Sequence, residues 1–235
     1  MMTDMRNQNT SPPVSDAERL FVVRDCALIA IATGRRALTL TELRDSLERV
    51  SADSIYFHFW GGLLQPRFEE REYNNDFAAW ARHGLHDGIL AERMAMLDPT
   101  QFEDIEELRQ ALLEVIDTRL DESEYLPWLR ATQRFEFIRS QIVVFDTSRR
   151  LRQPAELAPL IGECSTSSVF YHFIDARRRQ PDHRDDFQAW LAGFDGEYRE
   201  QCDQLAGVDP YFGSLSELRQ RLADIFQAIS TGATA

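Results

Sequence analysis

The chain has 235 residues and a formal net charge of −13, and its 43% hydrophobic and 28% charged residues are typical of a folded protein. The acid excess argues against a general binder of nucleic acid, because phosphates would be repelled at long range. All 26 basic residues are arginine, which excludes Schiff-base chemistry and a P-loop lysine.

Targeting signals are missing from the sequence. The longest uncharged apolar run, Cys26–Thr33, is too short for a membrane span of about 20 residues. The N-terminus lacks the basic stretch and apolar core of a secretion signal. The cysteines Cys26, Cys164 and Cys202 form no C-x-x-C pair, which favours reduced thiols. We therefore expect a cytoplasmic protein that makes no membrane contact.

Several motifs occur twice and in the same order. SIYFHF at Ser54–Phe59 returns as SVFYHF at Ser168–Phe173, and DFAAW at Asp76–Trp80 returns as DFQAW at Asp186–Trp190. A D-P pair and an ELRQ string follow in both halves. This order predicts a tandem duplication of one unit of about a hundred residues.

The first predicted element is a disordered N-terminal tail, because residues 1–14 are polar and contain proline. Ser15 and Glu18 have the spacing of a capping box that opens the ordered part. The apolar segment Leu20–Thr33 follows, and its counterpart in the second unit is Phe135–Thr147. The first copy has a helical pattern, whereas the second alternates like a strand. We predict helices for both, because two copies should share one structure.

Capping signals predict a series of helices after this segment. Thr39 and Glu42 form a second capping box, and Pro154 supplies a first-turn proline at the matching place. Serines precede the histidine motif in both units, and Asn75 or Asp76 suits the start of the DFAAW helix. The predicted helices of the first unit include Thr41–Val50, Asp87–Leu97 and Ile105–Leu120.

The fold expected from these elements is all-α, with about five helices per unit and an approximate two-fold relation between the units. The expected organisation is an N-terminal tail at 1–14, a first unit at 15–120, a linker at 121–133, a second unit at 134–230 and a disordered C-terminal tail at 231–235.

The repeated motifs place a serine four residues before a histidine, on one helix face, and an aspartate follows in both units. This set has the composition of a catalytic triad or a ligand site. The aromatic neighbours of each histidine and the capping positions of the aspartates favour a structural role instead. The residues are Ser54, His58 and Asp76 in the first unit and Ser168, His172 and Asp186 in the second.

Two further groups recur. Trp80 and Trp190 share helix faces with phenylalanines, which indicates core packing, although an exposed ring would suit a stacking platform. Arginine doublets at matched positions are candidates for binding a phosphate or carboxylate, with internal ion pairs as the alternative. The doublets are Arg35, Arg36, Arg149 and Arg150.

Candidate metal ligands cluster in the first unit, and a metal site common to both units would have to rest on His58 and His172 alone. His83, His86, Asp87 and Glu92 accompany His58 in the first unit, but the second unit has no histidine at the matching stretch. The spacing lacks the E-x-x-H pattern of helical metal sites. We therefore predict no metal site and no other cofactor.

The motifs resemble an uncharacterised bacterial and archaeal family of unknown function, with the pattern S-[IL]-Y-x-H, N-D-F-x-x-W, L-x-D-x-x-L-A-E, D-P and E-E-L-R. The first unit matches over most of Leu38–Leu120, whereas the second keeps most of the pattern but loses L-A-E. The resemblance implies an all-helical cytosolic protein without a known activity, present here as two copies.

The duplicated unit without a catalytic motif predicts a non-catalytic adaptor or regulator that works through protein contacts, including self-association. The alternative is a small-ligand or metal-binding protein, possibly an enzyme, centred on the repeated Ser/His/Asp sets. An exposed apolar surface would favour the adaptor. A cavity beside the two histidines would favour the alternative.

Overall fold

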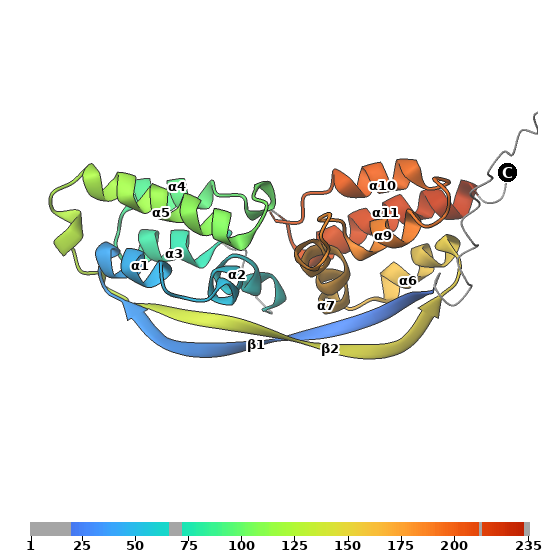
Figure 1. Ribbon diagram of the computed structural model, residues 1–235, viewed down its shortest axis with the longest axis horizontal. Helices are drawn as coiled ribbons and strands as arrows, with labels where there is room; N and C mark the ends of the chain where they lie inside the picture. Colours follow the sequence, from blue (N-terminus) through green and yellow to red (C-terminus); the bar gives the residue numbers. More distant parts are fainter. Residues whose placement is uncertain (1–19, 66–71, 212, 233–235) are drawn as a thin grey trace, which may run out of the picture.

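The computed structural model describes residues 20–65, 72–211 and 213–232. Two long strands, β1 (Phe21–Ala37) and β2 (Phe135–Leu151), pair as an antiparallel ribbon. The helices lie along one side of this curved ribbon, with one set at each end (Figure 1). The fold is therefore mixed α and β, and the all-α prediction is wrong.

The error concerns Leu20–Thr33 and Phe135–Thr147, which form most of the two strands rather than helices. In β2 the buried Phe135 and Phe137 flank the exposed Glu136, which is the period of two that a half-buried strand requires. Alanines in the middle of β1 give the first copy its helical pattern. Pairing with the β-branched residues of β2 overrides that weak local preference.

Each strand begins beneath the helices of the other half of the chain. Phe21 pairs with Leu151 at one end of the ribbon, and Ala37 pairs with Phe135 at the other. The start of β1 contacts α7 (Thr166–Val169) and the π-helical turn after it, whereas the start of β2 contacts α2 (Ala52–Trp60). Each helical set is therefore completed by a strand that enters from the opposite half.

The two ends of the ribbon carry matching irregularities. The ladder shifts register near Thr33 and again near Thr147. The Thr33 hydroxyl donates to the Phe137 carbonyl at 2.7 Å, and the Thr147 hydroxyl donates to the Val23 carbonyl at 2.6 Å. Gly34 and Ser148 follow these threonines with φ of 76° and 61°. These bulges bend the ribbon at equivalent places.

The first helical unit follows β1, and its predicted starts agree with the structure. Thr39 accepts a hydrogen bond from the Glu42 amide, and Asn75, Asp87 and Asp104 cap later helices in the same way. The helices of this unit are α1 (Leu40–Leu47), α2 (Ala52–Trp60), α3 (Asp76–His83), α4 (Gly88–Ala95) and α5 (Ile105–Asp121).

The second helical unit follows β2. A 3₁₀ turn beginning at Pro154 opens it, and the histidine motif continues from α7 into a π-helical turn at Phe170–Asp175. Its helices are α6 (Leu157–Glu163), α7 (Thr166–Val169), α8 (Ala176–Arg179), α9 (Asp186–Leu191), α10 (Arg199–Ala206) and α11 (Leu215–Gly232).

The two units pack on each other above the ribbon. The Tyr56 hydroxyl donates to buried Asp175 at 3.3 Å, and the Arg178 guanidinium lies 4.8 Å from the centre of the Tyr56 ring. Trp60 contacts Tyr211 with ring centres 4.9 Å apart. These contacts join α2 to the second unit, so the two sets of helices form one body.

The predicted tail at 1–14 and the capping box of Ser15 and Glu18 lie outside the described residues. At the other end α11 runs to Gly232, and the rest of the predicted 231–235 tail also lies outside them. The predicted linker contains a 3₁₀ turn at Leu126–Trp128. Over the described ranges, none of the helices has the length and apolar character needed to cross a bilayer.

Candidate functional site

The predicted residues Ser54, His58 and Asp76 hold a single residue of β2. The Ile138 amide donates to His58 Nε2 at 3.1 Å, and the Ser54 hydroxyl donates to the Ile138 carbonyl at 2.8 Å. His58 Nδ1 lies 2.9 Å from the Asp76 carboxylate. Because an amide only donates, Nε2 must be unprotonated, and Nδ1 carries the proton shared with Asp76.

The second unit repeats this arrangement on β1. The Arg24 amide donates to His172 Nε2 at 2.9 Å, and the Ser168 hydroxyl donates to the Arg24 carbonyl at 2.7 Å. His172 Nδ1 lies 2.8 Å from Asp186. Arg24 and Ile138 occupy matching positions of the two strands. We call the two Ser/His/Asp sets the strand clamps.

The strand clamps close the outer edges of the ribbon. In a two-stranded ribbon every second residue turns its N–H and C=O away from the partner strand. Unpaired groups of this kind cost stability and invite aggregation. Each serine hydroxyl donates a hydrogen bond to a backbone carbonyl, and each imidazole Nε2 accepts one from a backbone amide. Neither group is therefore placed to act as a nucleophile or a general base.

The surroundings of the histidines leave little room for a ligand. His58 is only 3% exposed, and its ring lies against Phe77, Phe135 and Phe137. His58 binds Ile138, which pairs with Ala32 of β1, and His172 binds Arg24 of the same strand. Ala32 and Arg24 are eight residues apart, which is roughly 26 Å at the usual rise of a strand. The two histidines therefore cannot share one metal ion.

The other metal candidates are dispersed. Asp87 caps α4 and pairs with Arg119 at 2.9 Å, and His83 pairs with Glu72 at 2.9 Å. Over the described part of the chain, no group of three or more His, Cys, Asp or Glu is arranged to hold a metal.

Both tryptophans serve the core. Trp80 is 7% exposed and donates from Nε1 to the Gln133 carbonyl at 2.7 Å, which ties α3 to the start of β2. Trp190 is partly buried and packs against Phe21 and Phe194, each with ring centres 5.3 Å apart. Neither ring offers a flat exposed platform.

The arginine doublets follow the bulges of the ribbon. Arg149 pairs with Glu163, and Arg150 pairs with Asp146 at 2.6 Å, so internal ion pairs occupy the second doublet. Arg35 and Arg36 are exposed, and no carboxylate of the described residues lies within salt-bridge distance of either. The doublets therefore do not make a matched pair of anion sites.

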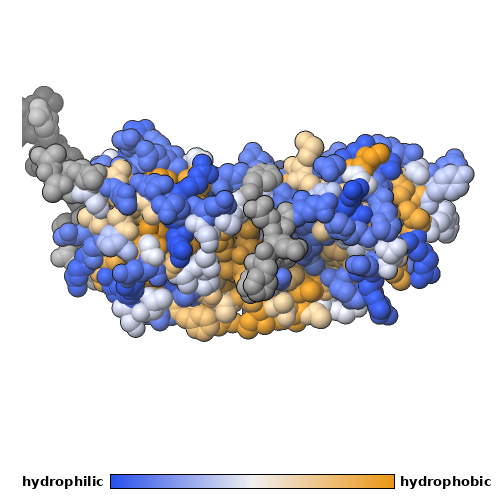
Figure 2. All heavy atoms as spheres, turned by 180° about the vertical axis from the view of Figure 1, so that it is seen from behind, coloured by the Kyte–Doolittle hydropathy of each residue, from blue (hydrophilic) through white to orange (hydrophobic). Residues whose placement is uncertain are grey.

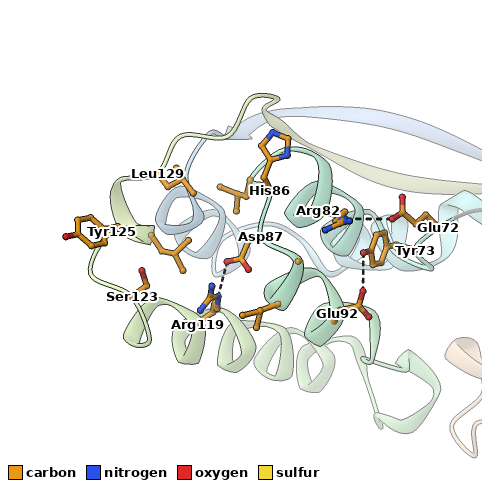
Figure 3. A pocket seen from close by; sticks show the side chains of 14 residues that line it. Glu72, Tyr73, Arg82, His86, Asp87, Glu92, Arg119, Ser123, Tyr125 and Leu129 are labelled. Atoms are coloured by element: carbon orange, nitrogen blue, oxygen red, sulfur yellow. Dashed lines mark hydrogen bonds and ion pairs between the residues drawn. The ribbon is translucent and has the colours of Figure 1, made fainter.

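A different feature, an open pocket of about 850 Å³, lies in the first helical unit. It is bounded by α4, the end of α5 and the 3₁₀ turn that follows (Figure 3). Asp87 and Arg119 meet across its middle at 2.9 Å. At one end the Tyr73 hydroxyl donates to Glu92 at 3.3 Å. Desolvation and the Glu92 charge raise the pKa of Tyr73.

None of the repeated motifs marks this pocket, apart from the His86, Asp87 and Glu92 that were considered as metal ligands. Its signal is the YLPW string, in which Tyr125 and Trp128 stand in a short proline turn directly after an acidic run. Both rings are strongly exposed, at 83% and 82%. Aromatic residues outside a helical or strand pattern have no core to enter, and this could have marked them as surface residues.

A buried carboxylate distinguishes the second unit. Asp185 caps α9 by accepting from the Gln188 amide at 2.9 Å, and burial raises its pKa to about 7. Its Oδ2 has no hydrogen-bond partner among the described residues, and Arg177 is 3.9 Å away. The matching residue of the first unit is the neutral Asn75, which caps α3.

Replacing Asp185 with asparagine should flatten the pH dependence of stability. The pKa of Asp185 is about 4 in the unfolded chain and about 7 in the folded protein. The contribution of this group to stability is complete below pH 4 and is lost as the pH rises towards 7. The variant should therefore gain on the wild type by roughly 2–4 kcal/mol between pH 4.5 and pH 8. Urea unfolding across this range measures the gain. The reciprocal Asn75→Asp variant should acquire the same pH dependence, and parallel curves for Asp185→Asn and wild type would refute the assignment.

The comparisons with known proteins concern the whole chain. A family model described as "Family of unknown function (DUF5752)" matches residues 18–227, a single span that includes both strands and both helical units. The structure of OrfY from Thermoproteus tenax is similar, with a TM-score of 0.78, 24% identity and coverage of 90% of this chain and 96% of that chain. This likeness shows a shared fold. No curated protein matches the chain.

Proposed function

We propose that this chain, which belongs to the DUF5752 family of unknown function, is a non-catalytic adaptor that self-associates through the middle of its ribbon. The observation that carries the proposal is an exposed apolar face on β1 and β2. The Ser/His/Asp sets support it indirectly, because their polar groups serve the backbone of the ribbon.

The apolar face lies between the two clamps. Residues paired across an antiparallel ribbon share one face, and every second residue returns to it. By this alternation, the face turned from the helices contains Ala27, Ile29, Ile31, Val143 and Phe145, which we call the ribbon face. The polar residues Asp25, Arg139 and Gln141 pair with members of the ribbon face and border it. Ile29 is 46% exposed and Phe145 is 50% exposed. Figure 2 shows hydrophobic residues gathered along the middle of the ribbon side, with hydrophilic residues on the flanks.

A second copy of the chain fits this face best. Ile29 and Val143 occupy matching positions of the two strands, as do Ile31 and Phe145, so the face has similar character on both sides of its centre. A two-fold dimer needs a patch that complements itself. Within the described ranges the ribbon has two strands, and the outer edge of such a ribbon can accept a further strand.

The test is the state of association in solution. We expect the wild-type chain to sediment as a dimer, and Ile29→Thr with Phe145→Thr to weaken the dimer at least about tenfold while circular dichroism stays unchanged. Threonine keeps the strand preference of both positions. The control Trp128→Ser removes an even more exposed apolar side chain, 82% exposed and away from the ribbon, and should leave the dimer intact. A wild-type chain that stays monomeric at every concentration would refute the proposal.

The same proposal places the protein in the cytoplasm and away from nucleic acid. All three cysteines are free, which suits a reducing compartment. The net charge of −13 opposes binding to phosphate backbones.

A further inference from the structure

We propose that the pocket of the first helical unit binds a basic segment of a partner protein, in which a lysine or arginine stands near an aliphatic side chain. This site is separate from the ribbon face. It would give the adaptor one partner site per chain.

The apolar end of the pocket carries exposed side chains. Tyr125 and Leu129 line it and are 83% and 43% exposed, and Ile89, which also lines the pocket, is 53% exposed. Trp128, which lies between Tyr125 and Leu129 in the sequence, is 82% exposed. Exposed aromatic and aliphatic side chains that gather at a concave site are typical of protein contacts, and tyrosine and tryptophan dominate binding energies.

The polar end of the pocket favours a cation. Glu72, Asp87 and Glu92 line it together with Arg82 and Arg119. Asp87 and Arg119 neutralise each other at 2.9 Å, whereas Glu72 lies 3.9 Å from the Arg82 guanidinium and 2.9 Å from the His83 ring.

Glu92 has no guanidinium partner among the described residues, and its carboxylate accepts a hydrogen bond from the Tyr73 hydroxyl. The turn that carries Tyr125 is preceded by the acids Asp121 and Glu124, whereas Glu122 is paired with Arg93 at 2.9 Å and with Arg119 at 3.0 Å. A basic group would therefore gain both a carboxylate and a favourable field.

The two ends of the pocket suit one short peptide. In Figure 3, Glu72, Tyr73 and Glu92 lie on one side of the Asp87–Arg119 pair, and Tyr125 and Leu129 lie on the other. A segment laid across the pair would place its cation near the glutamates and its aliphatic residue near the rings. Tyrosine faces add attraction for a cation.

This chemistry is particular to the first unit. When the DFAAW and ELRQ motifs are aligned, Arg82 matches Ala192 and Arg119 matches Ile229. The strand clamps and caps recur in both units because both need them to fold. Arg82 and Arg119 do not recur, so the shared framework does not require them.

The probe for this site is a library of random twelve-residue peptides displayed on phage and selected on the full-length protein. We expect enrichment of peptides with lysine or arginine beside leucine, isoleucine or valine. The strongest sequence, made as a fluorescent peptide, should bind at least about tenfold more weakly to Tyr125→Ser with Leu129→Ser. Glu72→Gln with Glu92→Gln should weaken binding and reduce its salt dependence.

Met96→Ser is the matched control, because Met96 is 82% exposed in the same unit and does not line the pocket. It should bind the peptide as the wild type does, and so should the ribbon-face variant, which separates this site from self-association. No enrichment, enrichment without basic residues, or equal binding by the pocket variants would each overturn the proposal.

Discussion

Replacing His58 with alanine is expected to lower the free energy of unfolding by about 4 kcal/mol. The change removes a buried ring from contact with Phe77 and Phe135 and leaves the Ile138 amide without its acceptor. Urea unfolding measures the total effect. Hydrogen exchange at the Ile138 amide measures the local one, and this amide should exchange much faster in the variant.

Two other variants separate the hydrogen bond from general damage. His58→Gln keeps an acceptor at a similar reach and should recover roughly 1 kcal/mol of the loss. His83→Ala removes a histidine of the same unit that is 56% exposed and should change stability by less than about 0.5 kcal/mol. If His58→Ala behaved like His83→Ala, the strand clamp would not stabilise the fold.

A half-chain of residues 20–130 is expected not to fold as a monomer. It contains the first helical unit and β1 but lacks Phe135 and Phe137, which are 5% and 1% exposed in the whole chain. Without them His58, Phe77 and Trp80 would face water. The loss of two buried phenylalanines alone would cost about 6–10 kcal/mol, which is comparable with the stability of a whole domain.

Two copies of this half-chain can bury each other's exposed core, because β1 of one copy can take the place of β2 in the other. Phe21 and Val23 occupy the positions in β1 that Phe135 and Phe137 occupy in β2. We therefore expect a strand-exchanged homodimer whose melting temperature rises with concentration. The full chain with Ile29→Thr and Phe145→Thr is the control, and its melting temperature should not depend on concentration. If the half-chain folded as a monomer, the first unit would not need a strand from the other half of the chain.

The local rules of the sequence predicted much of the fold. The cap Thr39 was identified correctly, and Asn75 was one of two residues proposed for the start of α3, because a cap depends on residues three positions apart. The recurrence of Ser54 and His58 also indicated a structural role, since framework residues must occur in both units. What those residues hold was not predictable from spacing alone. Their partner, Ile138, lies 80 residues or more along the chain.

The strands and the pocket escaped prediction for a related reason. The choice between helix and strand for the alanine-rich centre of β1 depends on β2, which comes far later in the chain. The pocket depends on how the end of α5 and the next turn meet α4. Both features arise from contacts between distant segments, and a pattern of near neighbours contains no record of such contacts.

The packing of β2 under the first helical unit also affects folding during translation. The helices of the first unit leave the ribosome before β2, which starts roughly a hundred residues after β1 ends, or about 5–20 s later at usual rates of elongation. During that interval the apolar side chains of the first unit that β2 later covers, such as Phe77, remain exposed to solvent. Its final packing must wait for the second half, which makes the exposed intermediate a natural substrate for chaperones.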